Sequence, residues 1–243
     1  MDPDQRSLLG FFTDRWMRYS SMPFFPVTTA GIENLPIKGK PVVYVANHNS
    51  FLDIFALSYL EREEGTFLDK TVGLKYLAKS DIFLIPWVGW LMGLVGQISL
   101  DRNARKEGKD ILCHARAKLQ NGVSVVVFPE GTRSRTGQMA PYKVGAFKLA
   151  VEEGVSVIPI TIKGTHELAG RPVDKTAGGA LIGADEMSLG EGEVTVIVHP
   201  EISSAGESVE TLMRKTRQVI QKELVAPQVC LMTEQGDIDV DLT

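Results

Sequence analysis

Cysteine and histidine are scarce in this 243-residue chain, which has two of the first and four of the second. The cysteines, Cys113 and Cys230, lie far apart and form no CxxC pair, so a disulfide-stapled scaffold is excluded and a reducing compartment is expected. No two histidines have the spacing of zinc ligands, and three of them, His114, His166 and His199, stand in no recognisable motif. The sequence therefore predicts no metal ion and no cofactor.

Long apolar runs are missing as well. The longest, residues 82–96, contains Pro86 and three glycines and is too short for an ordinary membrane-spanning helix. We expect it to be buried in the protein or to lie at a membrane interface. A signal-peptide pattern is also absent, because Asp14, Arg15 and Arg18 interrupt the apolar residues near the N-terminus.

An excess of charge of one sign is confined to the last part of the chain. The formal net charge is −4, and residues 226–243 contain four carboxylates and no Lys or Arg. The remaining residues 1–225 are close to neutral, so no basic surface for binding nucleic acid is predicted. We expect residues 226–243 to form an acidic, disordered tail.

The composition is that of a globular domain, with 44% hydrophobic and 23% charged residues. The expected strands are 41–46, 123–129, 155–162 and 194–199, and the expected helices are 50–62, 102–121, 143–153 and 207–224. Continuous apolar strands separated by helices predict an α/β fold, with a largely parallel sheet and helices on both faces. Pro159 indicates a bulge or an edge position for its strand. Residues 170–193, rich in Gly and Ala, are expected to form a surface loop.

Residues 1–26 are expected to form a separate N-terminal segment. Within them, Leu8, Phe12, Trp16 and Tyr19 fall on one helical face, with arginines beside it. Such an amphipathic helix suits a membrane interface. The alternative is a helix that docks on the protein's own core. The chain then divides into a membrane-interface segment (1–26), a main domain (27–225) and the acidic tail (226–243).

The stretch VVYVANHNSFLDIF (42–55) places His48 between an expected strand and an expected helix, with Asp53 five residues later. Ser50 and Asp53 resemble a capping box, which would start the helix at Ser50 and leave His48 outside it. The chain then bends between the two side chains, so Asp53 can reach one ring nitrogen and aim the other outward. A base and an orienter arranged in this way can activate a nucleophile. The alternative is a capped helix with a surface histidine.

A second stretch, VVVFPEGTRSR (125–135), is again an apolar strand that ends in a polar turn. In a parallel sheet its Glu130, Gly131 and Arg133 emerge at the same edge as His48. Gly131 permits a positive φ or a close approach of the backbone, and the guanidinium of Arg133 suits phosphate oxygens. The alternative is a loop with a solvated arginine.

Four segments, in order along the chain, resemble the sequence motifs of the glycerolipid acyltransferases. NHNSFLD resembles their NHx4D motif and FPEGTRS their second signature, while GQISLDR (96–102) and VIPITI (157–162) are similar to two further blocks. The resemblance covers residues 27–200, and within the family the chain looks most like the 1-acylglycerol-3-phosphate (lysophosphatidic acid) acyltransferases. Lys79-Ser80-Asp81 departs from the Lys-x-Glu of many bacterial members, and the segment 79–102 resembles that of plastid members.

The resemblance implies an acyltransferase that moves a fatty acyl group from acyl-CoA or acyl-carrier protein to the free hydroxyl of lysophosphatidate, giving phosphatidate. It implies that His48 is the general base and that Asp53 fixes the tautomer of the imidazole. Glu130, Gly131 and Thr132 would belong to the acceptor-binding turn, with Glu130 as a hydrogen-bonding orienter. The acceptor phosphate would be held by Arg133, Arg102 and Lys79.

The resemblance also implies an enzyme of phospholipid biosynthesis that works on a membrane surface, at the cytoplasmic face or in a plastid or another organelle. Other interpretations stay open: an acyltransferase acting on glycerol 3-phosphate or another lysophospholipid, a thioesterase-like hydrolase, and a silent lipid-binding module. The intact pair of His48 and Asp53 argues against a silent module. The arginines argue against simple hydrolysis, because water needs no phosphate clamp.

Overall fold

The computed structural model describes residues 25–36, 40–60, 75–80, 84, 90, 97–100, 112–134, 136–168 and 192–225. All four predicted strands lie within these residues. The predicted N-terminal helix, nearly all of the apolar run 82–96, most of the glycine-rich loop, the acidic tail and Arg102 lie outside them.

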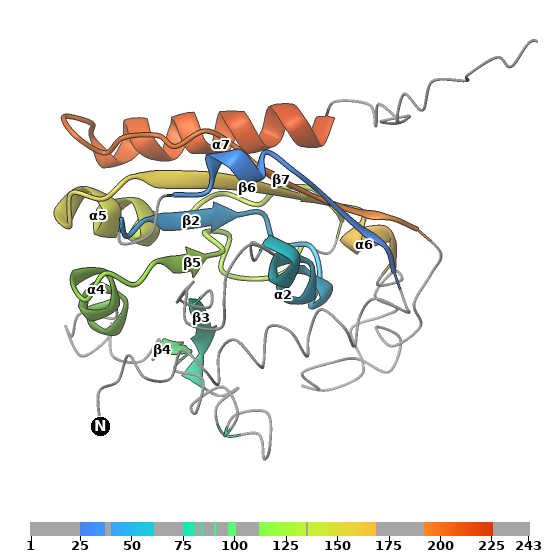
Figure 1. Cartoon of the computed structure of the whole chain (residues 1–243), viewed down its shortest axis with the longest axis horizontal. Coiled ribbons are helices and arrows are strands. Elements are labelled where there is room, and N and C mark those ends of the chain that lie inside the picture. Colours follow the sequence, from blue (N-terminus) through green and yellow to red (C-terminus); the bar gives the residue numbers. More distant parts are fainter. Residues whose placement is uncertain are drawn as a thin grey trace, which may run out of the picture.

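Seven strands form one sheet in the described part of the chain (Figure 1): β1 (Val27–Ala30), β2 (Val43–Ala46), β3 (Lys75–Lys79), β4 (Ile98–Leu100), β5 (Val125–Val127), β6 (Val157–Lys163) and β7 (Val194–Val198). Their order in the sheet is β1-β7-β6-β2-β5-β3-β4. Neighbours from β6 to β4 are parallel, β7 runs antiparallel to β6, and β1 runs parallel to β7. The predicted α/β fold with a largely parallel sheet is confirmed.

Helices cover both faces of this sheet, as predicted. They are α2 (Leu52–Leu57), α4 (Cys113–Gln120), α5 (Gly145–Glu152), α6 (Thr165–Leu168) and α7 (Val209–Val225), with 3-10 turns η2 (Ile32–Asn34) and η3 (Ser58–Leu60). In β2, Val43 and Val45 point into a core shared with α4, α5 and α7, whereas Tyr44 and Ala46 point into a core shared with α2 and α6. This alternation follows from the two-residue period of a strand.

Two helices end at left-handed glycines. Gly122 (φ 78°) follows α4, and Gly154 (φ 63°) follows α5. After each glycine, the amide of the next valine turns back and donates to a carbonyl near the end of the helix. These bonds satisfy carbonyls that the helix end leaves open. Strands β5 and β6 begin soon after the two stops, so the glycines also set where these strands enter the sheet.

The prediction that Pro159 marks a bulge or an edge strand is wrong. Strand β6 lies between β7 and β2, and Pro159 is in register with Val45 of β2. Its carbonyl accepts a hydrogen bond from His199 N–H on the β7 side (3.0 Å). The N–H and C=O of one strand residue point to the same side, so the missing N–H also faces β7, where the antiparallel ladder ends at Val198. The proline therefore removes one bond at the end of a ladder and leaves the β2 side intact.

Candidate active site

The turns that follow β2 and β5 leave the sheet at one edge. These strands are parallel neighbours with Val45 opposite Val127, so His48 and Glu130 each follow a strand at its carboxyl end. Two hydrogen bonds join the turns: His48 N–H donates to Oε1 of Glu130 (2.9 Å), and Ser134 N–H donates to the His48 carbonyl (2.8 Å). The predicted meeting of the two segments at one edge is confirmed.

Asn47 extends the sheet by one step with its side chain. Its Nδ2 donates to the carbonyl of Ile162 (2.9 Å), and its Oδ1 accepts from Ile162 N–H (2.8 Å). The amide thus pairs with β6 as a strand residue would, and its polar atoms are satisfied although the side chain is fully buried. Because the side chain completes the pairing, the backbone can turn away from the sheet at His48.

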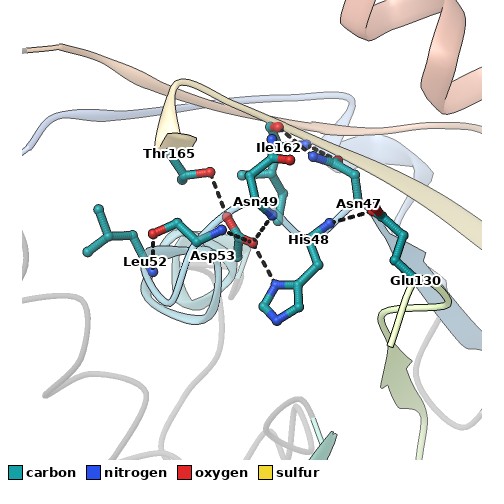
Figure 2. A network of polar contacts seen from close by, with 9 residues as sticks. Asn47, His48, Asn49, Leu52, Asp53, Glu130, Ile162 and Thr165 are labelled. Atoms are coloured by element: carbon teal, nitrogen blue, oxygen red, sulfur yellow. Dashed lines mark hydrogen bonds and ion pairs between the residues drawn. The ribbon is translucent and has the colours of Figure 1, made fainter. Parts of the chain in front are cut away.

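Asp53 is a fully buried carboxylate at the centre of the turn (Figure 2). Its Oδ2 accepts three hydrogen bonds, from His48 Nδ1 (2.8 Å), Asn49 N–H (2.7 Å) and Ser50 N–H (3.0 Å). Its Oδ1 accepts a fourth from the hydroxyl of Thr165 in α6 (2.6 Å). These donors replace the water that burial removes and hold the carboxylate in one orientation. The predicted contact between Asp53 and a ring nitrogen of His48 is present.

Ser50 lies two residues before the helix that carries Asp53. Its Oγ accepts from Leu52 N–H (3.1 Å), while its own N–H donates to the Asp53 carboxylate three residues on. This is the reciprocal pattern of a capping box, except that the hydroxyl serves the amide two residues ahead rather than three. Helix α2 is shorter than the predicted 50–62, because its α-helical hydrogen bonds stop at Leu57 and a 3-10 turn follows. His48 lies outside the helix, as predicted.

The imidazole of His48 is held from two sides. Asp53 binds Nδ1, and the ring of Phe128 stacks on the imidazole with 4.1 Å between centroids and 20° between planes. Because the Asp53 oxygen accepts from Nδ1, a neutral ring carries its acceptor lone pair on Nε2. Figure 2 shows that nitrogen pointing away from Asp53, and the side chain is 17% exposed. The site therefore presents an acceptor nitrogen that a substrate hydroxyl could reach.

Glu130 is a buried carboxyl group that bridges two backbone segments. Its Oε1 accepts from His48 N–H (2.9 Å), and its Oε2 accepts from Ala140 N–H (2.8 Å). Burial raises the pKa of Glu130 above its ordinary value, and the two amide bonds and the charges of His48 and Arg217 offset part of that shift. Both oxygens are engaged by backbone amides, so the geometry agrees with an orienting role rather than with that of a second base.

Gly131 has a positive φ (70°), one of the two possibilities that the sequence leaves open. A side chain at this position would also collide with Lys143, because a Cβ built there would lie 2.3 Å from the lysine Nζ. The backbone of Lys143 is tied to the same turn, since its N–H donates to the Pro129 carbonyl (2.9 Å). Glycine is therefore needed for the backbone angle, whereas the flexible, exposed side chain of Lys143 could shift to make room for a Cβ.

This arrangement of motifs on one sheet edge matches a known family. Residues 26–163, more than half of the chain, match the family described as Acyltransferase. The chain belongs to this acyltransferase family.

Several curated relatives of this acyltransferase carry the name 1-acyl-sn-glycerol-3-phosphate acyltransferase. One from Chlamydomonas reinhardtii is 37% identical over 97% of this chain and 64% of its own length. A chloroplastic relative from Arabidopsis thaliana is 35% identical over 92% of this chain and 56% of its own length. The acyltransferase thus spans about three fifths of the length of these relatives.

A solved structure shares the fold. The 1-acyl-sn-glycerophosphate acyltransferase PlsC from Thermotoga maritima has a TM-score of 0.64 and 27% sequence identity. The similarity covers 91% of this chain and 78% of the PlsC chain. The agreement extends well beyond the two turns of the site and supports the described arrangement of strands and helices.

The remaining predicted site residues of the acyltransferase come from the turn after β5 and from the ends of β3 and β4. Thr132 is exposed and Arg133 is partly buried, and both lie in the turn that follows Gly131. Lys79 is the last residue of β3, which is parallel to β5, so its backbone lies at the same carboxyl edge of the sheet. Arg102 lies outside the described residues, two positions beyond the end of β4.

The sequence patterns missed four residues that support the site. Two of them bind it directly: Asn47 pairs with β6, and Thr165 holds Asp53. Lys143 crosses Gly131, and the charge of Arg217 acts on Glu130. Apart from the position of Asn47 beside His48, no local signal pointed to them, because their partners are distant in sequence.

Two kinds of site are not found in the described part of the acyltransferase. Within it, no three His, Cys, Asp or Glu side chains are grouped as metal ligands. None of the helices in these described residues has the length and apolar character needed to cross a membrane.

Proposed function

We propose that the protein transfers a fatty acyl group from a thioester to the free hydroxyl of 1-acylglycerol 3-phosphate and so forms phosphatidate. The names of its relatives support this acceptor and product. The observation that carries the chemistry is the 2.8 Å bond between His48 Nδ1 and Asp53, with Nε2 facing outward. This pair supplies the base that an unactivated hydroxyl requires.

In the proposed reaction, Nε2 of His48 takes the hydroxyl proton as the acceptor oxygen attacks the thioester carbonyl. Asp53 keeps Nδ1 in the donor position and stabilises the imidazolium that forms. When the tetrahedral intermediate collapses, the C–S bond breaks, the new C–O ester bond remains, and the imidazolium returns its proton to the departing thiolate. The acceptor supplies the nucleophilic oxygen, so no covalent acyl-enzyme is needed.

We assign the acceptor phosphate to the turn after β5. Gly131 and Thr132 shape this turn, Glu130 holds it against the His48 backbone, and Arg133 presents a planar guanidinium for bidentate bonding to phosphate oxygens. Lys79 and Arg102 would add positive charge from the ends of β3 and β4. A phosphate on this edge would bring the neighbouring glycerol hydroxyl toward His48.

We place this reaction at a membrane surface, since lysophosphatidate and phosphatidate are both lipids. Residues 27–225 would form the catalytic domain, residues 1–26 would contact the membrane interface, and residues 226–243 would form a solvated tail. The donor would be acyl-CoA or acyl-carrier protein. The names of the chloroplastic relatives favour an organelle membrane over the cytoplasmic face of another membrane.

A panel of acceptors tests this function. Purified protein in mixed micelles is given acyl-CoA or acyl-carrier protein with lysophosphatidate, glycerol 3-phosphate, lysophosphatidylcholine or no acceptor. We expect release of free thiol to match formation of phosphatidate and to require lysophosphatidate. Equal thiol release without any acceptor would identify a hydrolase, and a faster reaction with glycerol 3-phosphate would change the acceptor.

A further inference from the structure

Arg217 of α7 holds a backbone segment that lies beside the active site. Its Nη1 donates to the Ala140 carbonyl (2.5 Å), and its Nη2 donates to the Met139 carbonyl (3.3 Å). The guanidinium also lies over the ring of Tyr142, 5.1 Å from its centre. One side chain from the last described helix thus clamps residues 139–142, which are far from it in the sequence.

The clamped segment leads directly to His48. The peptide unit between Met139 and Ala140 carries the N–H that donates to Oε2 of Glu130 (2.8 Å), while Arg217 binds the carbonyls on both sides of that N–H. The other oxygen of Glu130 accepts from the backbone N–H of His48 (2.9 Å). An unbroken series of contacts therefore runs from Arg217 through Ala140 and Glu130 to the imidazole-bearing residue.

The charge of Arg217 acts on the same series. Glu130 accepts from two amides most strongly when it is ionised, because protonation turns one of its oxygens into a hydroxyl, which is a donor and a weaker acceptor. Burial works against the ionised form, whereas the two amide bonds, the charge of His48 and the charge of Arg217 favour it. Arg217 therefore supports the Glu130 bridge in two ways, by holding the Ala140 backbone and by favouring a carboxylate that can accept both bonds.

We infer that Arg217 is a positioning residue for His48, acting through Ala140 and Glu130. Its effect on turnover rests on the acyl transfer proposed above. The contacts themselves do not, because they join residues of the protein to one another. Helix α7 carries none of the four motifs, yet through this arginine it determines where the backbone of the NHNSFLD turn lies.

The surroundings of Arg217 allow a direct chemical test. The arginine lines a hollow of about 320 Å³ together with Pro141, Tyr142, Met213 and Arg214. Removing its side chain would enlarge this hollow at the position of the lost guanidinium. Free guanidinium ion could then occupy that position and bind the same two carbonyls, which a smaller ammonium ion could do less well.

The first arm of the experiment measures kcat and KM for Arg217→Ala, with Arg214→Ala as the matched control from the same hollow. We expect Arg217→Ala to lower kcat about tenfold through loss of charge-assisted bonds, with both KM values little changed and with Arg214→Ala near wild type. Millimolar guanidinium should restore part of the loss, and methylammonium should not. A fall in kcat that follows thermal stability and resists guanidinium would overturn the inference in favour of a structural clamp.

The second arm needs no substrate. Amide hydrogen exchange of His48 and Ala140 is compared between wild type and Arg217→Ala by NMR. We expect faster exchange at both amides in the variant, and unchanged exchange at both would overturn the inference. If wild type forms no phosphatidate, this arm still tests the contacts, and the failure belongs to the proposed function. Should Arg217→Ala not fold, Arg217→Lys keeps the charge and one bond and should give intermediate exchange and turnover.

Discussion

Two histidines in this protein follow β-strands of the same sheet, but their hydrogen-bond partners differ. His48 follows β2 and binds a buried carboxylate, Asp53, through Nδ1 (2.8 Å). His199 follows β7 and binds the hydroxyl of Thr161 through Nε2 (2.8 Å). A carboxylate can only accept and so sets the tautomer of the ring, whereas a hydroxyl can donate or accept and sets none.

The direction of the strands separates the two histidines further. β2 is parallel to its neighbours β5 and β6, so its carboxyl end meets the turn that carries Glu130 and Gly131. β7 runs antiparallel to β6, so His199 lies opposite Pro159, a residue of β6. The ion pair of Lys163 and Glu223 (2.7 Å) lies near the His199 ring. His48 is therefore the candidate base of the two, because the parallel strand β5 brings a second polar turn, with Glu130 and Gly131, to the same edge of the sheet.

The largest expected contrast is in turnover. His48→Ala should lower kcat at least about 10²-fold, because a positioned base typically contributes 10² to 10⁴. His199→Ala should leave kcat nearly unchanged. The measurement is acyl transfer to lysophosphatidate by purified variants whose thermal unfolding shows that they are folded. Near-normal turnover in folded His48→Ala would remove the base from the proposed mechanism.

Arg133 sharpens the comparison through substrate affinity. Loss of its guanidinium should weaken binding of the acceptor phosphate by about 1.5–3 kcal/mol, the range for hydrogen bonds to charged groups. Arg133→Ala should therefore raise KM for lysophosphatidate, with Arg133→Lys between it and wild type, because a lysine keeps the charge but loses the fork. Lys163→Ala, near His199, serves as the control cation and should change neither KM. A rise in donor KM alone would reassign Arg133 to the donor.

Two buried threonines give a matched pair with a smaller expected effect. Thr165 binds Asp53 and Thr161 binds His199, and both are fully buried. Each change to valine removes one hydrogen bond. Thr161→Val should cost about 1 kcal/mol of unfolding free energy, and Thr165→Val, whose partner is a carboxylate, should cost about 1.5–3 kcal/mol. Only Thr165→Val should also lower kcat, since it loosens the carboxylate that orients His48. The measurements are urea unfolding and steady-state kinetics of both variants. If kcat were the same in Thr165→Val and Thr161→Val, Thr165 would have only a structural role.

The smallest effect concerns pH and belongs to His199. Burial lowers its pKa below the ordinary 6.5, with Lys163 adding to the shift and Glu223 opposing it. The unfolded chain therefore binds this proton more readily than the folded one, so the stability that the neutral ring contributes is present above about pH 6.5 and is lost as the pH falls below it. Thermal unfolding at several pH values from 7.5 to 5 should show a steeper loss for wild type than for His199→Asn. If the unfolding temperature fell equally with pH in both proteins, the lowered pKa of His199 would be contradicted.

Much of the fold could be predicted because its signals are local. The β-branched runs 41–46 and 194–199 predicted β2 and β7, and the ends predicted for the helices 102–121 and 143–153 lie next to the observed ends of α4 and α5. The prediction for Pro159 failed for an equally clear reason. The hydrogen bonding that a proline removes from a sheet depends on which neighbouring strand its nitrogen faces. For Pro159 that strand is β7, which comes later in the chain.

In the site, likewise, only the contacts between residues close in sequence could be predicted. His48, Ser50 and Asp53 lie within six residues, and a helix start with a capping pattern is enough to bring the imidazole and the carboxylate together. Thr165 and Ile162 bind this turn across 112 and 115 residues of sequence, and no pattern of spacing connects such distant positions. These two residues reach the turn only because β6 pairs with β2 in the folded sheet.

The sequence by itself determined the elements with a short period and the contacts made within one turn, because hydrogen bonds to the nearest residues and the burial of alternate side chains depend on few neighbours. It determined in this way the strand that precedes His48, the cap that holds Asp53 and the backbone angle at Gly131. Tertiary structure decided which donors complete the Asp53 shell, why Glu130 is buried, and that Arg217 of α7 holds the segment beside it. These depend on the order of strands in the sheet, which the packing of the whole chain selects and no single segment contains.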